Sequence, residues 1–117
     1  MIWCVDDDNT IRDIEVYTLT QTGFEAKGFA DGVSMLEALK TEKPELIVLD
    51  IMLPDSSDLK LLHELLAIKR DARIVIISAI NKPEITREAL IAGAKGFITK
   101  PFNEVEFLCK VRMALED

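Results

Sequence analysis

The sequence is poor in several features that mark specialised classes of protein. It has two cysteines in 117 residues and no apolar run long enough to span a membrane. Basic residues are outnumbered by acidic ones, 14 against 21, which gives a net charge of −7. That balance argues against sequence-independent binding to nucleic acid or to anionic membrane, because both need a basic face. We therefore expect a cytoplasmic protein that contacts neither nucleic acid nor membrane directly.

What is present describes an ordinary globular chain. Apolar residues make up 49% and charged residues 30% of the sequence, and the length fits one domain that can bury a core without disulfides. Neither repeats nor low-complexity linkers divide it, so we expect a single domain over residues 1–117. Cys4 and Cys109 lie in apolar-patterned segments, and we expect both to be buried, reduced thiols.

Short apolar segments alternate with helix-like segments along the whole chain. The predicted strands cover residues 2–5, 24–29, 46–50, 73–78 and 96–99. The predicted helices cover about 9–21, 31–40, 59–69, 83–92 and 103–115. Five alternating units at this spacing predict parallel strands joined by right-handed crossovers, with helices on both faces. The predicted fold class is α/β, a single doubly wound five-stranded parallel sheet.

Two of these segments give more local expectations. The charges in 24–29 are typical of a half-exposed edge strand. Asp31 can cap the helix that follows it, with Val33, Leu36 and Leu39 on the inner face.

Polar side chains follow four of the predicted strands. Asp6 and Asp7 follow the first strand, and Asp50 ends the third. Ser78 ends the fourth, and Lys100 follows the fifth. The carboxyl ends of parallel strands lie along one edge of a sheet, where ligands bind. Three neighbouring carboxylates repel one another, so they must hold a proton or share a cation, and hard oxygen ligands suit Mg²⁺. The hydroxyl and the ammonium are donors suited to a phosphoryl group.

Each of these residues also has a purely structural interpretation. Asp50 can end a turn, and the acids after the first strand can complement a helix dipole at a few tenths of a kcal/mol each. Ser78 can be a small turn residue, and Lys100 can extend to solvent from a strand end. It is the five together, at one edge, that favour a functional site.

The motifs resemble those of response-regulator receiver domains of two-component signalling, over essentially the whole chain. The matching pieces are Val-Asp-Asp-Asp at 5–8, Leu-Asp-Ile-Met-Leu-Pro at 49–54, Ile-Ser-Ala at 77–79, Gly-Ala at 93–94 and Phe-Ile-Thr-Lys-Pro-Phe at 97–102. The resemblance implies a flavodoxin-like (βα)5 sandwich with strand order 2-1-3-4-5. It also implies a phosphorylation-dependent signalling switch rather than an enzyme, whose chemistry is limited to its own phosphorylation and slow dephosphorylation.

The resemblance implies a role for each acid. Asp50 is the expected phosphoacceptor, taking its phosphoryl group from a histidine kinase or a phosphotransfer protein. Asp7, Asp50 and the backbone carbonyl of Met52 are the expected Mg²⁺ ligands, and Asp6 is expected to act through water.

The remaining site residues are implied in the same way. Ser78 and Lys100 are expected to bind the phosphoryl oxygens, with a cis peptide between Lys100 and Pro101. Phe97 occupies the aromatic switch position, which moves with Ser78 and changes an interaction surface on the fourth and fifth helices. Met52 and Ile80 are expected to set the rate of dephosphorylation, because apolar side chains there can neither orient nor deprotonate water.

Some positions depart from the family pattern. Asp58 stands where the family commonly has glycine, and Lys95-Gly96 replaces the acids that often precede the switch aromatic. The resemblance allows a phosphorylation-dependent homodimer, but Lys95-Gly96 and an exposed Ile91 argue against the dimer that uses the fourth and fifth helices. With no effector domain after Asp117, we expect a stand-alone receiver acting on a downstream protein, or a receiver cut from its effector domain.

Two other functions compete with this one. A Mg²⁺-dependent phosphohydrolase with Asp50 as nucleophile needs a second acid two residues later, and Met52 stands there. A degenerate receiver that acts without phosphorylation has typically lost an acid or the lysine, and this sequence retains them all.

Overall fold

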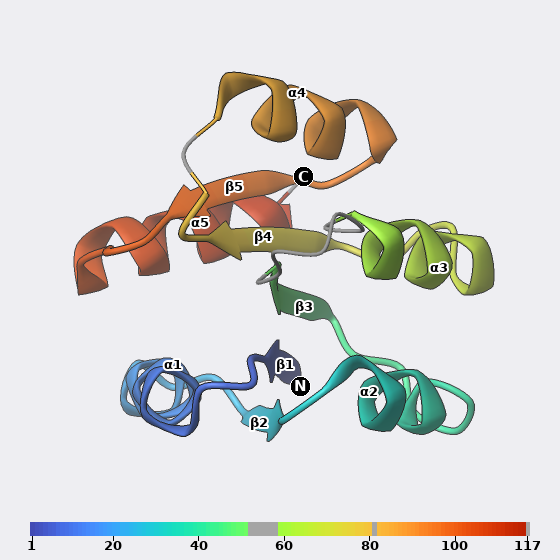
Figure 1. The fold of residues 1–117 in the computed structure, drawn as a ribbon. Coiled ribbons are helices and arrows are strands. Elements are labelled where there is room, and N and C mark those ends of the chain that lie inside the picture. Colours follow the sequence, from blue (N-terminus) through green and yellow to red (C-terminus); the bar gives the residue numbers. More distant parts are fainter. Residues whose placement is uncertain (52–58, 81, 117) are drawn as a thin grey trace.

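The computed structural model of the protein describes residues 1–51, 59–80 and 82–116, and the predictions made for Met52 and Asp58 lie outside these ranges. The chain forms a five-stranded parallel sheet in the order β2-β1-β3-β4-β5 (Figure 1). The strands are β1 (Ile2–Val5), β2 (Ala26–Phe29), β3 (Leu46–Asp50), β4 (Ile74–Ser78) and β5 (Gly96–Thr99). The predicted fold class and strand order are confirmed.

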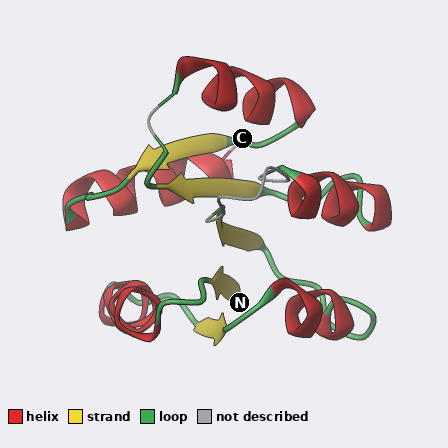
Figure 2. Cartoon of the chain, viewed as in Figure 1, coloured by secondary structure: helices red, strands yellow, loops and turns green. Residues whose placement is uncertain are grey.

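Helices cover both faces of the sheet (Figure 2). They are α1 (Asn9–Gln21), α2 (Gly32–Ala38), α3 (Lys60–Ile68), α4 (Pro83–Ala92) and α5 (Glu104–Glu116). The helices α1 and α5 lie on one face, and α2, α3 and α4 lie on the other (Figure 1). Among the described residues, no helix is both long and apolar enough to cross a bilayer.

The position of β3 in the centre of the sheet explains why its sequence is a continuous apolar run. Ile47 and Leu49 face the core under α2, α3 and α4, whereas Leu46 and Val48 face the core under α1 and α5. All four side chains are at most 1% exposed. A strand buried on both faces leaves no polar position until its carboxyl end, so Asp50 is the first residue that can carry chemistry.

Helix α2 differs from its prediction. Asp31 caps it as expected, accepting a hydrogen bond from the Ser34 amide over 2.7 Å. The predicted inner face is right for Leu39, which is buried, and for Leu36, which packs against the core. It is wrong for Val33, which is 80% exposed, and it omitted Met35, which is fully buried. The helix also ends at Ala38, and Leu39 is buried as its C-terminal cap. Packing against the sheet turns Met35 rather than Val33 toward the core.

The prediction of two buried cysteines is half wrong. Cys4 is buried in β1, but Cys109 is exposed on α5. The buried face of α5 is formed by Phe107, Val111 and Ala114, which recur with helical spacing. Cys109 lies on the opposite side of that helix, so an apolar pattern alone assigned it to the wrong face.

The edge strand is shorter than predicted. β2 covers Ala26–Phe29 rather than 24–29, and its register begins with Ile2 opposite Ala26. Gly28 is exposed and Ala26 and Lys27 are half-buried, which fits the predicted half-exposed edge.

Candidate functional site

The acids predicted from the strand ends lie together. Asp6 and Asp7 directly follow β1, and Asp50 ends β3. One carboxylate oxygen from each lies within 4.8 Å of the others. Strands β1 and β3 pair directly in the sheet, so their carboxyl ends are neighbours. The three residues line a concavity of ≈190 Å³ that Asp31 also borders.

Asp6 is held on several sides. Its amide donates to the carbonyl of Phe29 over 3.0 Å, which fixes its backbone against β2. Its Oδ1 accepts a hydrogen bond from the Asp8 amide over 2.8 Å. Its Oδ2 lies 3.4 Å from Nζ of Lys100, and the side chain is fully buried. The carboxylate therefore has a fixed orientation before any ligand arrives.

Lys100 connects the two buried acids. Its Nζ lies 3.0 Å from Oδ1 of Asp50 and 3.4 Å from Oδ2 of Asp6. Burial favours the neutral amine and lowers the pKa of Lys100, but the contacts with Asp50 and Asp6 outweigh it, so the pKa is raised overall. The backbone contributes as well, since the Lys100 amide donates to the carbonyl of Ser78 over 2.8 Å. Lys100 is a permanent positive charge at this edge of the sheet.

The Asp50 carboxylate is buried and incompletely paired. Its side chain is 2% exposed, and among the described residues no donor makes a well-aligned hydrogen bond to either oxygen. The 3.0 Å approach of Lys100 is therefore an ion contact with poor hydrogen-bond geometry. Burial raises the pKa of Asp50 to about 6; the Lys100 ammonium opposes this rise, and the charge of Asp6 adds to it. Near neutral pH Asp50 is mainly ionised, and the ion contact with Lys100 is the one pairing that the described residues give it.

This donor set fits a hard divalent cation. The carboxylate oxygens of Asp6, Asp7 and Asp50 can meet around one ion, and Asp7 is exposed, which leaves room for water. Mg²⁺ prefers a few carboxylates together with water. A cation would also supply the charge compensation that the orphaned oxygens of Asp50 lack. The fourth predicted ligand, the carbonyl of Met52, lies outside the described residues.

The predicted phosphoryl donor Ser78 is buried at the end of β4, opposite Thr99 of β5 in the sheet register. Its Oγ accepts a hydrogen bond from the Ile80 amide over 2.9 Å, which leaves the hydroxyl hydrogen free for another acceptor. Phe97 is half-buried on β5. The peptide between Lys100 and Pro101 is cis, as expected.

One buried acid near the site, Glu15, was not predicted from the sequence. Glu15 of α1 is 1% exposed, and within the described ranges neither carboxylate oxygen has a hydrogen-bond partner. Burial first, and then the charges of Asp6 and Asp50, raise the pKa of Glu15 to about 8, with Lys100 and Arg12 opposing the rise. The available signal was its spacing, because Glu15 shares a helix face with Ile11 and Leu19 and so lies in the apolar stripe.

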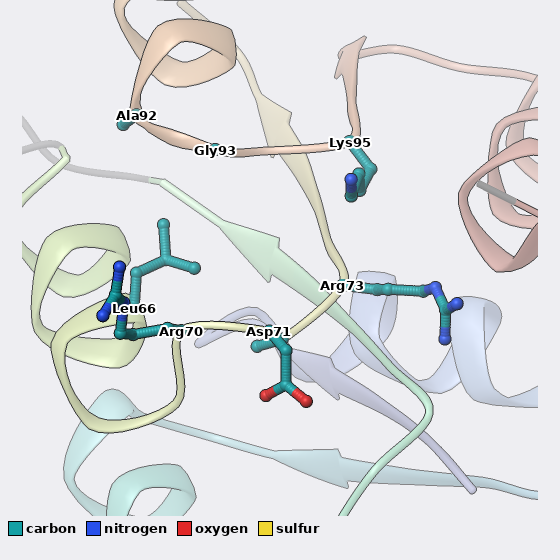
Figure 3. Close-up of a pocket in the computed structure, with 8 residues that line it drawn as sticks. Leu66, Arg70, Asp71, Arg73, Ala92, Gly93 and Lys95 are labelled. Atoms are coloured by element: carbon teal, nitrogen blue, oxygen red, sulfur yellow. The ribbon is translucent and has the colours of Figure 1, made fainter.

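A second concavity lies at the opposite end of the sheet. It has a volume of ≈570 Å³ and is lined by residues that precede β4 and β5, among them Arg73 and Lys95. Figure 3 shows Leu66 and Arg70 on one side of it and Arg73 and Lys95 on the other. The acids lie at the carboxyl ends of the strands, so this concavity takes no part in their chemistry.

Comparison with known proteins agrees with this geometry. Residues 2–112 match the model of the response regulator receiver domain family. The chain is 35% identical to the chemotaxis protein CheY of Thermotoga maritima, over 92% of each chain. It is 32% identical to the transcriptional regulatory protein CreB of Escherichia coli over 97% of its own length, and it spans about half (50%) of that relative.

The structural comparison leads to the same group. The receiver domain of NtrX from Brucella abortus superposes with a TM-score of 0.90 at 34% identity. The match covers 99% of this chain and 98% of that one.

Proposed function

Because the chain belongs to the response regulator receiver domain family, we propose that it is a phosphorylation-dependent switch with Asp50 as its phosphoacceptor. Receiver domains are signalling modules of two-component systems rather than catalytic enzymes. The observation that carries the proposal for this chain is the environment of Asp50. Its buried, unsatisfied carboxylate ends the central strand, 3.0 Å from a lysine and beside two further acids.

The chemical step needs little from the protein besides position and charge. An Asp50 carboxylate oxygen attacks the phosphorus of the donor, the new O–P bond forms, and the bond to the donor's leaving group breaks with its electron pair. Asp50 must be ionised to attack, and its pKa of about 6 satisfies this near neutral pH. Lys100 offsets part of the charge that the phosphoryl group adds, and the Ser78 hydroxyl has a hydrogen free to donate to it.

The acids around Asp50 would also form a binding site for a cation. Asp6, Asp7 and Asp50 would hold Mg²⁺, with the Met52 carbonyl as a further ligand. Bound there, Mg²⁺ would neutralise charge on the acids and on the transferred group. The phosphohydrolase alternative remains less suitable, because position 52 carries methionine rather than an acid.

Phosphorylation would be transmitted to other proteins through a change in a surface of the domain. A phosphoryl group on Asp50 would draw the Ser78 hydroxyl toward it, and Phe97 on the neighbouring strand would follow, altering the face formed by α4 and α5. The expected donors are a histidine kinase or a phosphotransfer protein. The output would be a downstream protein or an attached effector domain, and a homodimer formed on phosphorylation belongs to this proposal too.

Intact mass after incubation with acetyl phosphate and Mg²⁺ tests the proposal. We expect one added phosphoryl group, stable in acid and labile in base, and its loss in Asp50→Asn. The matched control is Asp13→Asn, since Asp13 is an exposed aspartate on α1 outside the acid cluster. Equal labelling of Asp50→Asn and the unmodified chain would exclude Asp50 as the acceptor.

A further inference from the structure

Arg12 of α1 holds the peptide unit on which two of the site's acids depend. Its Nη1 donates a hydrogen bond to the carbonyl oxygen of Asp6 over 2.6 Å, and its Nη2 donates to Oδ1 of Asn9. The Asp6 carbonyl belongs to the planar peptide unit that joins Asp6 to Asp7. The guanidinium therefore fixes the plane from which the Asp7 side chain begins.

Asp7 needs such a support more than its neighbours do. It is exposed, and within the described part of the chain no hydrogen-bond donor reaches its carboxylate. Asp6, by contrast, is held through its own side chain by the Asp8 amide and by Lys100. The position of the Asp7 carboxylate is consequently set by its backbone, and the backbone is set on one side by Arg12.

Gly28 of β2 makes the contact of Arg12 possible. A Cβ atom at position 28 would lie 2.9 Å from Cδ and 3.0 Å from Cγ of Arg12. Both carbons are in the middle of the arginine side chain, whose head is fixed at Asp6 and Asn9. A Cβ atom at position 28 would therefore force a shift, and the atoms in its way lie in the middle of the arginine side chain rather than at its far end. An exposed edge-strand residue thus determines whether Arg12 reaches the Asp6 carbonyl.

We propose that Arg12 and Gly28 form a positioning pair for the cation-binding acids: Gly28 admits the arginine side chain, and Arg12 orients the peptide unit preceding Asp7. Neither residue contacts the cation in this arrangement. The inference rests on the proposed function, because it takes Asp7 as a ligand of Mg²⁺. Groups that orient ligands from outside typically change metal affinity by about 10-fold or more.

A purely electrostatic role for Arg12 makes a different prediction. Lysine at position 12 keeps the positive charge, but one ammonium cannot span the two acceptors that the planar guanidinium bridges. Arg12→Lys therefore separates charge from geometry. Gly28→Ala also separates charge from geometry, because it removes no charge and no hydrogen-bonding group while displacing the Arg12 side chain.

The experiment is a Mg²⁺ titration of the full chain without phosphodonor, followed through backbone amide NMR shifts. We expect the Kd for Mg²⁺ to rise about 10-fold in Arg12→Gln, Arg12→Lys and Gly28→Ala. Before Mg²⁺ is added, the amide shifts of each variant should match those of the unmodified chain outside the β1–α1 junction and β2. Two controls should bind Mg²⁺ like the unmodified chain. Lys27→Gln removes a charge from the same strand, and Gly96→Ala fills a strand position where a Cβ atom would meet nothing closer than 3.8 Å.

A double variant separates positioning from general destabilisation. Since both residues act through one contact, Arg12→Gln combined with Gly28→Ala should bind Mg²⁺ no more than about two-fold more weakly than either single variant. A Kd within two-fold of the unmodified chain in Arg12→Lys or Gly28→Ala would overturn the positioning pair, and so would additive effects. Absence of Mg²⁺ binding in the unmodified chain would instead overturn the metal site of the proposed function, and this inference with it.

Discussion

Lys100 and Asp6 are 94 positions apart in the sequence, yet Nζ of one lies 3.4 Å from Oδ2 of the other. The contact joins the first and the last strand of the chain, because Asp6 follows β1 and Lys100 follows β5. The same ammonium reaches Asp50 on β3. One positive charge thus serves two buried carboxylates, and the third, Asp7, is left without it. This deficit of positive charge leads to the first prediction.

We expect Mg²⁺ to stabilise the protein by binding only its folded form. With a millimolar Kd, about 10 mM Mg²⁺ should add about 1.4 kcal/mol to the free energy of unfolding, which raises the melting temperature by several degrees. Asp7→Asn and Asp50→Asn should raise the melting temperature without Mg²⁺, because each removes repulsion, and should weaken the response to it. Asp13→Asn should do neither. A melting temperature that responds to Mg²⁺ no more than to NaCl of equal ionic strength would show that the acids bind no cation.

We also predict slow loss of the phosphoryl group. In the proposed function the attacking water would approach past the side chains at positions 52 and 80, and neither methionine nor isoleucine can orient or deprotonate it. Met52→Asn, or a polar residue in place of Ile80, should therefore speed dephosphorylation, measured by intact mass against time after the donor is removed. Ile80 is half-buried, and its amide rather than its side chain binds Ser78, so the substitution should leave that hydrogen bond intact. A lifetime of seconds in the unmodified chain that neither change alters would contradict the prediction.

Glu15 should make stability fall as the pH rises. Its pKa is raised from 4.5 to about 8 by burial first and by Asp6 and Asp50 next, so the unfolded chain releases this proton at a lower pH than the folded one. The contribution of protonated Glu15 to the free energy of unfolding is fully present below about pH 4.5 and is lost as the pH rises toward 8. At about 1.36 kcal/mol per pKa unit, the loss is on the order of 5 kcal/mol.

Urea unfolding at several pH values without Mg²⁺ measures this effect. The free energy of unfolding of Glu15→Gln should depend less on pH between about pH 5 and 8 than that of the unmodified chain. The variant should exceed the unmodified chain in stability most at the upper end of this range. The exposed Glu88→Gln is the control and should follow the unmodified chain. Asp50, whose pKa is raised to about 6 by burial, contributes a slope of the same sign at lower pH in all three proteins. Parallel curves for Glu15→Gln and the unmodified chain would mean that Glu15 ionises normally.

The two cysteines should differ in reactivity. Cys109 is exposed on α5, whereas Cys4 is fully buried, and burial raises its pKa well above the usual value. Since the thiolate is the reactive form, we expect iodoacetamide to modify Cys109 in the folded chain and Cys4 only after unfolding. Peptide mass mapping after a short treatment distinguishes the two. Modification of Cys4 at a comparable rate under native conditions would disagree with its burial.

Much of the site followed from the local pattern. The run from Leu46 to Leu49 predicted a strand buried on both faces, and Asp50 is the first polar residue after it. Alternating strands and helices place all strand ends at one edge, so the acids and Lys100 had to approach one another. No distance was needed for that conclusion, because parallel topology supplies it.

Other features required the packing itself. The pattern of α2 admitted Val33 as an inner residue, and the pattern of α5 admitted Cys109. A helix has several apolar positions, and the rotation that buries one set is chosen by the sheet beneath it. Glu15 shows the converse, since a charged residue is buried where the helix phase demands it.

What the sequence determined by itself is thus the order of elements, the parallel sheet and the residue types at its functional edge, since these depend on periodicity and on chain connectivity. Only the tertiary structure decided which contacts hold those residues. The lysine shared by Asp6 and Asp50 and the arginine that crosses Gly28 to reach the Asp6 carbonyl join segments that no local pattern relates. Side-chain contacts of this kind depend on distances of a few tenths of an ångström between packed elements, and periodicity carries no information at that scale.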